Sequence, residues 1–348
     1  MGEITNIYLI RHAEAEGNLY RRIQGQYNSK ITPLGEKQIL ALVNRMKKIP
    51  YKAVISSDLL RATDTAQRLA QIYNLKVIQK KELREIAVGC WEDKPWGNLA
   101  QEYPKQMDNF LHDIEQFVVE GSEKINLVKK RMKEVILQIA YTFAGETVLI
   151  VSHGTAITAF FSEILEVPCA EVKRKYGTGD NTAVSYIQVI DNKIDICYGN
   201  DASHLTEGIS TYYRQKKWRE SEKQMDGVYF VPAEVKDINF FSKGNSKKVI
   251  AKVGKDKVGL MVLDVGQEEL INAGEVLYCW VDPLYRKQRI GIQLLGYAVS
   301  TFRELGRERI ILSLRKEDKE ALSFFIHAGF QIDKSDRQKI SLIMDIVV

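Results

Sequence analysis

An arginine and a histidine stand side by side directly after a short apolar run near the beginning of this 348-residue chain. Residues 7–10 predict a buried strand, and Arg11 and His12 follow at its end. Side chains just past a strand end of an α/β sheet project into the crevice where ligands bind. A guanidinium there holds phosphoryl oxygens bidentately, and an imidazole is a nucleophile. We therefore expect this pair to form a phosphate site that contains its own nucleophile.

Three later motifs supply the further cations and the acid that phosphoryl transfer needs. Arg61 stands in Ser-Asp-Leu-Leu-Arg-Ala, at the expected start of a helix that follows a strand. Glu85, in Leu-Arg-Glu, is a carboxyl group that can protonate a leaving oxygen, and His153, in Val-Ser-His-Gly, ends another apolar run. Each motif alone is more often structural than catalytic, but their order along the chain favours one shared site.

In this order the motifs resemble the histidine phosphatase superfamily, in the branch that contains cofactor-dependent phosphoglycerate mutases and small-molecule phosphatases. The resemblance covers about residues 5–205 and implies a phosphoglycerate mutase-like, three-layer α/β/α domain. It implies that His12 is phosphorylated, and that Glu85 donates a proton and then activates water. Ala13 stands where the family usually has glycine, but its backbone carbonyl can still orient the imidazole. The residues that the resemblance assigns to phosphate binding are Arg11, Asn18, Gln24, Arg61, His153 and Gly154.

The segment after Glu85 bears on whether the phosphohistidine is hydrolysed or returns its phosphate to a bound hydroxyacid. Mutases of the superfamily usually carry a longer, basic insertion there, whereas residues 92–123 are compact and rich in acids. We therefore favour a phosphomonoester hydrolase that needs no metal, with a phosphoglycerate mutase-type enzyme as the alternative. The aromatic residues near this segment either line a substrate pocket or pack beneath it, and they are Trp91, Trp96, Tyr103, Phe110 and Phe117.

A second candidate site lies in residues 276–295, which run from an apolar segment through a basic loop into an amphipathic segment. Exposed amides at a helix N-terminus bind pyrophosphate. These residues resemble the GNAT acetyltransferase family, whose Val-x-Pro-x-Tyr-Arg loop cradles coenzyme A. The resemblance covers about residues 228–348 and implies an α+β domain that binds acetyl-CoA and acts on an unidentified acetyl acceptor. The residues it assigns to the cofactor are Trp280, Val281, Arg286, Lys287, Gln288, Arg289, Ile290 and Gly291.

Two positions depart from the GNAT pattern. Arg289 stands where the loop's first glycine is expected, and Phe325 replaces the tyrosine that often protonates the departing thiolate. Glu275 is either a general base or a surface carboxylate. A degenerate module that senses coenzyme A or binds a partner therefore stays open beside an active N-acetyltransferase.

The elements that must position these residues form two successive α/β patterns. We expect a first domain over residues 1–210, a polar linker over 211–226 and a second domain over 227–348. A helix should begin at Thr32-Pro33, and another should cover residues 58–73. Predicted strands cover residues 7–10, 53–56, 147–152, 183–190, 249–253, 258–263, 275–281 and 309–314, and a helix covers 290–304.

Composition bounds the partners. The formal net charge is +5, and no long basic run interleaved with aromatics predicts nucleic-acid binding. The 4 cysteines have no Cys-x-x-Cys spacing, so we expect a reducing compartment and no zinc site. No apolar stretch approaches the roughly 20 residues that span a membrane. These features predict a cytoplasmic protein, and the resemblance to the histidine phosphatases implies that its substrate is a small phosphomonoester.

Overall fold

The computed structural model describes residues 2–215, 227–234, 245–266 and 272–348, which divide into two compact units. The first unit contains residues 2–17, 23–93 and 103–215. The second contains residues 18–22 and 94–102 together with the described residues from 227 onward. Of the expected linker, residues 216–226 lie outside the described part of the chain. Residues 211–215 are helical, and Thr211 is buried within the first unit.

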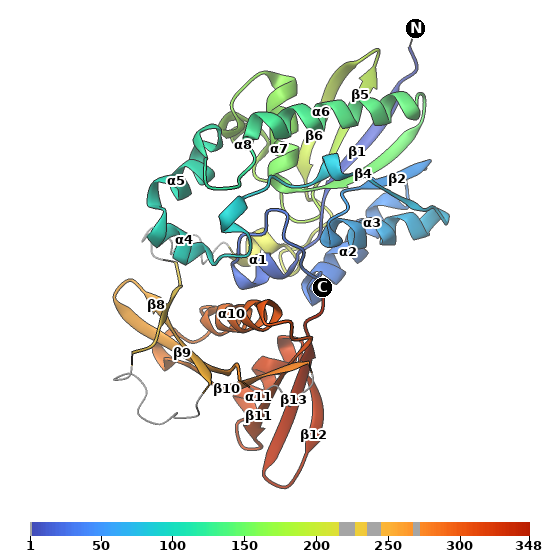
Figure 1. Ribbon diagram of the computed structural model, residues 1–348. Helices are drawn as coiled ribbons and strands as arrows, with labels where there is room; N and C mark the ends of the chain where they lie inside the picture. The colour runs from blue at the N-terminus through green and yellow to red at the C-terminus, as the bar shows by residue number, and fades with distance from the viewer. Residues whose placement is uncertain (1, 216–226, 235–244, 267–271) are drawn as a thin grey trace. The chain divides into compact units, whose positions relative to one another are not determined.

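The first unit is built on a six-stranded sheet with the order β3-β2-β4-β1-β5-β6 (Figure 1). The first four strands in this order are parallel, and β5 and β6 are antiparallel additions at one edge. The strands are β1 (Thr5–Arg11), β2 (Ala53–Ser56), β3 (Val77–Gln79), β4 (Thr147–Ser152), β5 (Val184–Ile190) and β6 (Lys193–Asp201).

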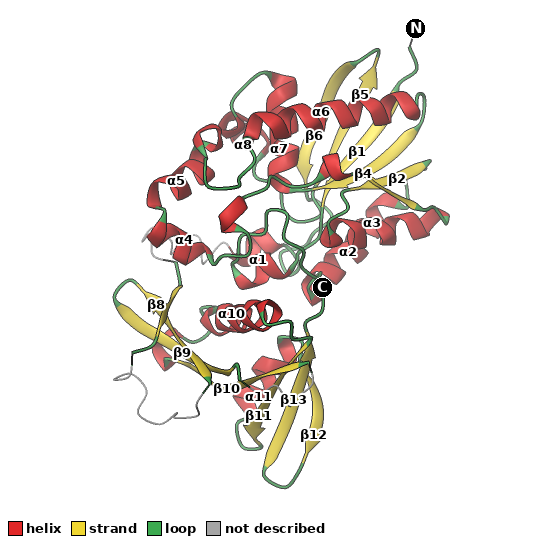
Figure 2. Cartoon of the chain, viewed as in Figure 1, coloured by secondary structure: helices red, strands yellow, loops and turns green. Residues whose placement is uncertain are grey.

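Helices cover both faces of this sheet, so the predicted three-layer α/β/α architecture is confirmed (Figure 2). Leu42, Met46 and Leu69 of α2 and α3 pack in one buried cluster with residues of β1, β2 and β4. Helices α6 and α7 contact each other and β1. The helices whose residues lie in this unit are α2 (Pro33–Met46), α3 (Leu60–Ala70), α5 (Pro104–His112), α6 (Ile125–Thr142), α7 (Gly154–Leu165) and α8 (Cys169–Tyr176), with 3₁₀ turns at η1 (Gln71–Tyr73), η2 (Lys81–Leu83), η3 (Gly89–Trp91) and η4 (Ile114–Gln116).

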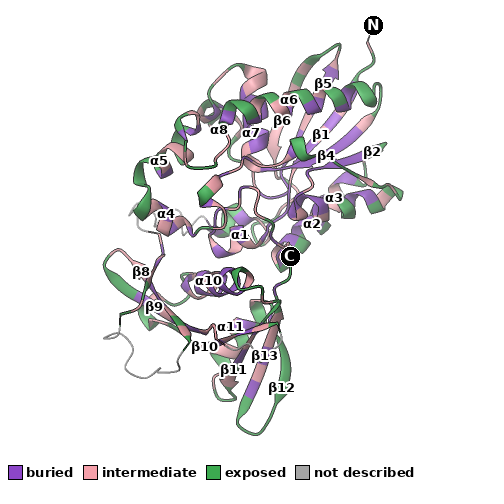
Figure 3. Cartoon of the chain, viewed as in Figure 1, coloured by how far each residue is buried: buried purple, intermediate pink, exposed green. Residues whose placement is uncertain are grey.

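Local sequence explains the best-predicted elements. Strands β2 and β4 are continuous apolar runs because helices bury both of their faces (Figure 3). Helix α2 begins as expected, since the Thr32 side chain accepts a 3.0 Å hydrogen bond from the Gly35 amide and Pro33 occupies the first turn. Both predicted strand ranges, 53–56 and 147–152, match the structure.

The second unit is built on a seven-stranded sheet with the order β12-β13-β11-β10-β9-β8-β7. Among the strand pairs in the described part of this unit, only β10–β11 is parallel, which fits the predicted α+β class. Helix α10 (Ile290–Glu304) covers the sheet with Leu294, Ala298 and Phe302 in the core. The other elements are β7 (Tyr229–Pro232), β8 (Ser246–Val253), β9 (Asp256–Asp264), β10 (Ala273–Val281), η6 (Pro283–Tyr285), β11 (Arg309–Arg315), α11 (Lys319–His327), β12 (Gln331–Ser335) and β13 (Lys339–Asp345).

Two short segments from the N-terminal half of the chain also pack in the second unit. Tyr20, in α1 (Glu16–Tyr20), is 5% exposed and belongs to its apolar core. Asn98, in α4 (Trp96–Glu102), pairs with both backbone groups of Phe230 at 2.9 Å. Among the helices that the structure describes, none is long and apolar enough to cross a membrane.

Candidate active site

His12 lies immediately after β1 with one ring nitrogen fixed by the backbone. Its Nδ1 donates a 2.7 Å hydrogen bond to the Ala13 carbonyl, which leaves Nε2 deprotonated and available as a nucleophile. The side chain is 4% exposed. Burial holds the pKa of His12 well below 6.5, and the positive charges of Arg61 and Arg11 lower it further. The imidazole is therefore neutral near pH 7.

Arg61, in the first turn of α3, faces the same imidazole. Its Nε donates to Nε2 of His12 at 3.3 Å, while its two terminal nitrogens donate to the carbonyls of Tyr27 and Gly25 at 2.9 and 2.7 Å. Burial lowers the pKa of Arg61 to about 10, partly countered by Glu85 and Glu92, so the guanidinium stays charged near neutrality. A fixed cation therefore lies beside the nucleophile.

Thr65, one helical turn after Arg61, explains part of the motif around it. Its hydroxyl donates to the Arg61 carbonyl at 2.7 Å and accepts from the Ala13 amide at 3.1 Å. The same Ala13 residue orients His12 through its carbonyl. One threonine therefore ties the helix that carries Arg61 to the loop that carries the nucleophile.

His153 and Arg11 complete a cradle around His12. Arg11 and Ser152 are partners in the parallel β1–β4 ladder, so the residues that follow both strands emerge together. The rings of His12 and His153 lie 5.1 Å apart, and burial lowers the pKa of His153 well below 6.5. Both ring nitrogens of His153 are buried without a hydrogen-bond partner among the described residues. A neutral, fully buried imidazole with an unused N–H suits the binding of an anion's oxygen.

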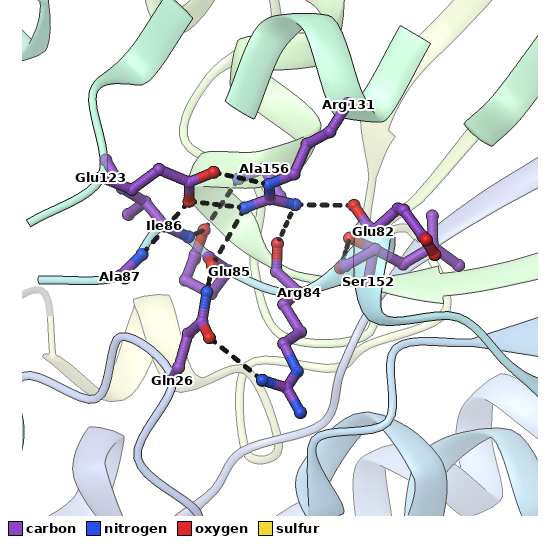
Figure 4. A network of polar contacts seen from close by, with 11 residues as sticks. Gln26, Glu82, Arg84, Glu85, Ile86, Ala87, Glu123, Arg131, Ser152 and Ala156 are labelled. Carbon is purple, nitrogen blue, oxygen red and sulfur yellow. Dashed lines mark hydrogen bonds and ion pairs between the residues drawn. The ribbon is translucent and has the colours of Figure 1, made fainter. Parts of the chain in front are cut away.

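Glu85 approaches this cradle from the loop after η2. Its carboxylate accepts hydrogen bonds from the Thr155 and Ala156 amides at 3.0 and 2.8 Å, in the first turn of α7 (Figure 4). His153 stands at the N-cap of that same helix. The structure therefore brings Glu85, His153 and the α7 N-terminus to the sheet edge where His12 lies.

Gly154 and Gln24, which the sequence predicts to bind phosphate, both lie in the first unit. A Cβ on Gly154 would lie 3.4 Å from Nε of Arg11, so the helix start runs closely past that guanidinium. Gln24 packs its amide against Gly17, where a Cβ would lie 2.1 Å from Nε2 of Gln24. Asn18 lies in α1, among the residues of the second unit.

Sequence reasoning missed a residue that holds Arg61 in place. Glu92 accepts hydrogen bonds from the amides of Gln26, Tyr27 and Val88 at 2.9, 2.7 and 3.1 Å. Its carboxylate thus shapes the turn whose carbonyls bind Arg61. The dipeptide Trp91-Glu92 stands in the sequence, but nothing near it indicates that Glu92 binds amides more than 60 residues earlier in the chain.

The aromatic residues near the acidic segment pack against one another. Trp91 is fully buried, and its ring lies 5.0 to 6.0 Å from those of Phe117, Tyr103 and Phe110. Trp91 and Phe117, which are 0% and 2% exposed, are packed in the interior, whereas Tyr103 is 40% exposed. Trp96 lies in the second unit under the Arg21 guanidinium.

The predicted cofactor loop lies between β10 and α10 in the second unit. Strand β11 pairs with β10 only as far as Val276, whereas β10 continues with β9 to Val281. One edge of the segment after Val276, which includes Trp280 and Val281, therefore has no strand partner in the described chain. The loop that follows carries the exposed Arg286, Lys287 and Gln288 up to the start of α10 at Ile290. Exposed cations beside a helix N-terminus suit an anionic group such as a pyrophosphate.

The two departures from the GNAT pattern have structural consequences. Arg289 adopts the left-handed conformation (φ 63°) that glycine adopts without strain, as does Lys287 (φ 62°). Phe325 is 5% exposed and packs edge-on against Phe324 and Phe330. Its phenyl ring has no acidic proton to give to a thiolate. Glu275 lies on β10, within its pairing with both β9 and β11.

Comparison with known proteins decides the family. Residues 7–202 match the sequence profile of the histidine phosphatase superfamily, branch 1. The chain belongs to this superfamily. Residues 212–330 match the acetyltransferase (GNAT) family, so a GNAT domain follows the histidine phosphatase domain. Both resemblances predicted from the motifs are confirmed.

Relatives of the histidine phosphatase domain carry two kinds of name. The chain is 33% identical over 209 residues, 59% of its length, to 84% of a metal-independent phosphoserine phosphatase from Arabidopsis thaliana. It is 32% identical over 171 residues, 49% of its length, to 80% of a probable phosphoglycerate mutase GpmB from Serratia proteamaculans. A solved phosphoserine phosphatase mutant from Entamoeba histolytica, in complex with phosphoserine, matches with a TM-score of 0.51 and 26% identity over 58% of this chain and all of that one. The names of these relatives thus divide between phosphatase and mutase.

Proposed function

We propose that the histidine phosphatase domain hydrolyses small phosphomonoesters through a phosphohistidine at His12, without a metal cofactor. The observation that carries this proposal is the pairing of a neutral, backbone-oriented imidazole with the fixed Arg61 guanidinium, 3.3 Å from the nucleophilic nitrogen. In the first step, Nε2 of His12 forms a bond to phosphorus as the bond to the leaving oxygen breaks. Protonated Glu85 gives its proton to that oxygen.

The second step regenerates the enzyme. Glu85, now a carboxylate, takes a proton from water as the water oxygen attacks phosphorus, and the bond between nitrogen and phosphorus breaks to release inorganic phosphate. Arg11, Arg61 and His153 bind the phosphoryl oxygens in both steps, and the burial of Arg61 and His153 keeps these electrostatic contacts strong. The substrate class that the relatives' names support is a small phosphorylated hydroxyacid or amino acid such as phosphoserine.

A phosphoglycerate mutase-type reaction is the second candidate, because relatives named as probable mutases match at nearly the same identity. The two reactions differ in the fate of phosphorylated His12. We expect the phosphohistidine formed from labelled phosphoserine to decay in water alone, in a rapid-quench experiment. Decay only after addition of a phosphoglycerate acceptor would favour the mutase.

We also propose that the GNAT domain binds acetyl-CoA through the amide of Val281 and through the loop from Arg286 to Gly291. The Trp280 amide points toward β9, because it lies two residues before the Asp282 amide, which donates to the Val258 carbonyl of β9 at 3.0 Å. The cofactor would supply the acetyl group, and these residues would hold its pantetheine and pyrophosphate. Because Phe325 cannot protonate a thiolate, a domain that binds acetyl-CoA without transferring its acetyl group is the alternative. Calorimetric titration with acetyl-CoA tests binding independently of any acceptor, and the absence of both heat and a thermal shift would refute it.

A further inference from the structure

Arg131 of α6 uses every N–H of its guanidinium on the loop that carries Glu85 and on one carboxylate (Figure 4). Nε and Nη2 bind the two oxygens of Glu123 at 2.8 and 2.9 Å. Nη1 donates to the carbonyls of Glu82 and Arg84 at 2.6 and 2.7 Å, and Nη2 donates to the carbonyl of Glu85 at 3.1 Å. The side chains of Arg131 and Glu123 are only 18% and 17% exposed.

Glu123 extends the hold on the loop past Glu85. Its backbone amide donates to the Ala87 carbonyl at 2.9 Å, and its carboxylate accepts from the Ala87 amide at 3.4 Å. The pair therefore contacts backbone groups on both sides of Glu85. An ion pair that only attached α6 to the rest of the domain would not need hydrogen bonds to three backbone carbonyls within residues 82–85.

The side chain of Glu85 is held independently at its other end. Its carboxylate accepts from the Thr155 and Ala156 amides, so the carboxyl group and its backbone are fixed by different elements. The carbonyl of Glu85 also accepts from Nε2 of Gln26 at 3.1 Å. A proton donor anchored in this way cannot follow a shift of its loop without losing its alignment, and a misplacement of about 1 Å can cost about 100-fold in rate.

We propose that Arg131, oriented by Glu123, is a positioning residue that sets the place of Glu85 for protonation of the leaving oxygen. The inference rests on the proposed function, because it takes Glu85 as the proton donor. Only a planar fork with five donors can bind two carboxylate oxygens and three carbonyls together, and a lysine has three donors at a single nitrogen.

The test compares two substrates that differ in how much their leaving group needs a proton. The leaving group of p-nitrophenyl phosphate is a stable phenolate, whereas that of phosphoserine is a strongly basic alkoxide. For Arg131→Lys we expect kcat/KM to fall about 100-fold on phosphoserine and less than about threefold on p-nitrophenyl phosphate. A merely structural defect would lower both by the same factor, and that result would overturn the proposal, as would no loss on either substrate.

Further variants make the readout specific to the proton donor. Glu85→Gln sets the pattern expected for loss of the proton donor, and adding Arg131→Lys to it should not increase the preference for p-nitrophenyl phosphate further. An additive increase in the double variant would contradict the proposal.

Glu123→Gln, which keeps an acceptor for the guanidinium, should show the same preference to a smaller degree, and it serves as the test if Arg131→Lys does not fold. Lys130→Ala, which removes an exposed pair with Glu134 from the same helix, is the matched control and should change neither rate.

The proposal and the proposed function fail in different ways. If wild type forms no phosphohistidine and hydrolyses neither substrate, the proposed function is wrong. If wild type is active through His12 but Arg131→Lys lowers both rates equally, only the positioning role is wrong.

Discussion

The two candidate sites of this chain differ in how deeply their polar and charged side chains are buried. In the histidine phosphatase domain, His12, Arg61 and His153 are 4%, 1% and 0% exposed. In the GNAT domain the cations of the cofactor loop face water, and the Arg286 side chain is 50% exposed beside Glu320 at 3.4 Å. Buried charges in fixed positions stabilise a transition state without reorganisation, whereas exposed ones attract an anion weakly and are screened by salt. The comparison indicates a site built for catalysis and a loop suited to reversible binding.

Replacing Arg61 by lysine should have the largest effect on the contrast between the buried site and the exposed loop. The variant keeps the charge but cannot bind the Gly25 and Tyr27 carbonyls and a phosphoryl group together. We expect kcat/KM for phosphomonoester hydrolysis to fall by about 10²- to 10³-fold. Arg68→Lys alters an exposed pair on the same helix and should leave the rate unchanged. A loss of less than about threefold for Arg61→Lys would show that the fixed geometry of the guanidinium is not used.

The loop of the GNAT domain should respond more mildly. We expect the double variant Arg286→Ala with Lys287→Ala to bind acetyl-CoA about tenfold more weakly at low salt, and the difference should shrink at high salt. Phosphomonoester hydrolysis should not change. Isothermal titration at two salt concentrations checks this, and an effect independent of salt would contradict the view of the loop as a screened, exposed binding surface.

Acid should weaken the first domain through its buried histidines. Burial lowers the pKa values of His12 and His153 well below 6.5 and that of His204 to about 4. In the unfolded chain these groups take up protons as the pH falls below about 6.5, so the unfolding free energy should decrease from there toward pH 4. His204→Gln should flatten this decrease in urea titrations at pH 7 and pH 5. An unchanged pH dependence in that variant would show that His204 does not contribute.

How much the sequence could predict differs between elements. Strands 53–56 and 147–152 and helix 290–304 were predicted with their observed bounds, because continuous burial and amphipathic period leave a strong local pattern. Strand β12 was missed, since every residue in it is exposed and its polar sequence carries no alternation. Strand β13 was also missed, although its Ile340 and Leu342 are buried in alternation. Short strands such as β3 have too few residues to show a period.

The candidate site divides in the same way. His12, Arg61, Glu85 and His153 stand in recognisable motifs at strand and helix ends, so their types and order were informative. Arg131 binds the Glu85 carbonyl, 46 residues earlier in the chain, and Glu92 binds the Tyr27 amide, 65 residues earlier. Every residue has a backbone carbonyl, so such a contact does not restrict which amino acid is contacted. Such supports become visible only when the fold brings the segments together.

In the proposed mechanism the phosphoryl group is transferred to His12 before it reaches water. Steady-state hydrolysis by wild type and His12→Ala, with a chelator present, tests this transfer. We expect wild type to hydrolyse p-nitrophenyl phosphate and phosphoserine undisturbed by the chelator, and His12→Ala to lose about 10³-fold or more of kcat while still binding acetyl-CoA. Full activity of His12→Ala, or wild-type hydrolysis abolished by the chelator, would contradict a metal-independent phosphohistidine mechanism.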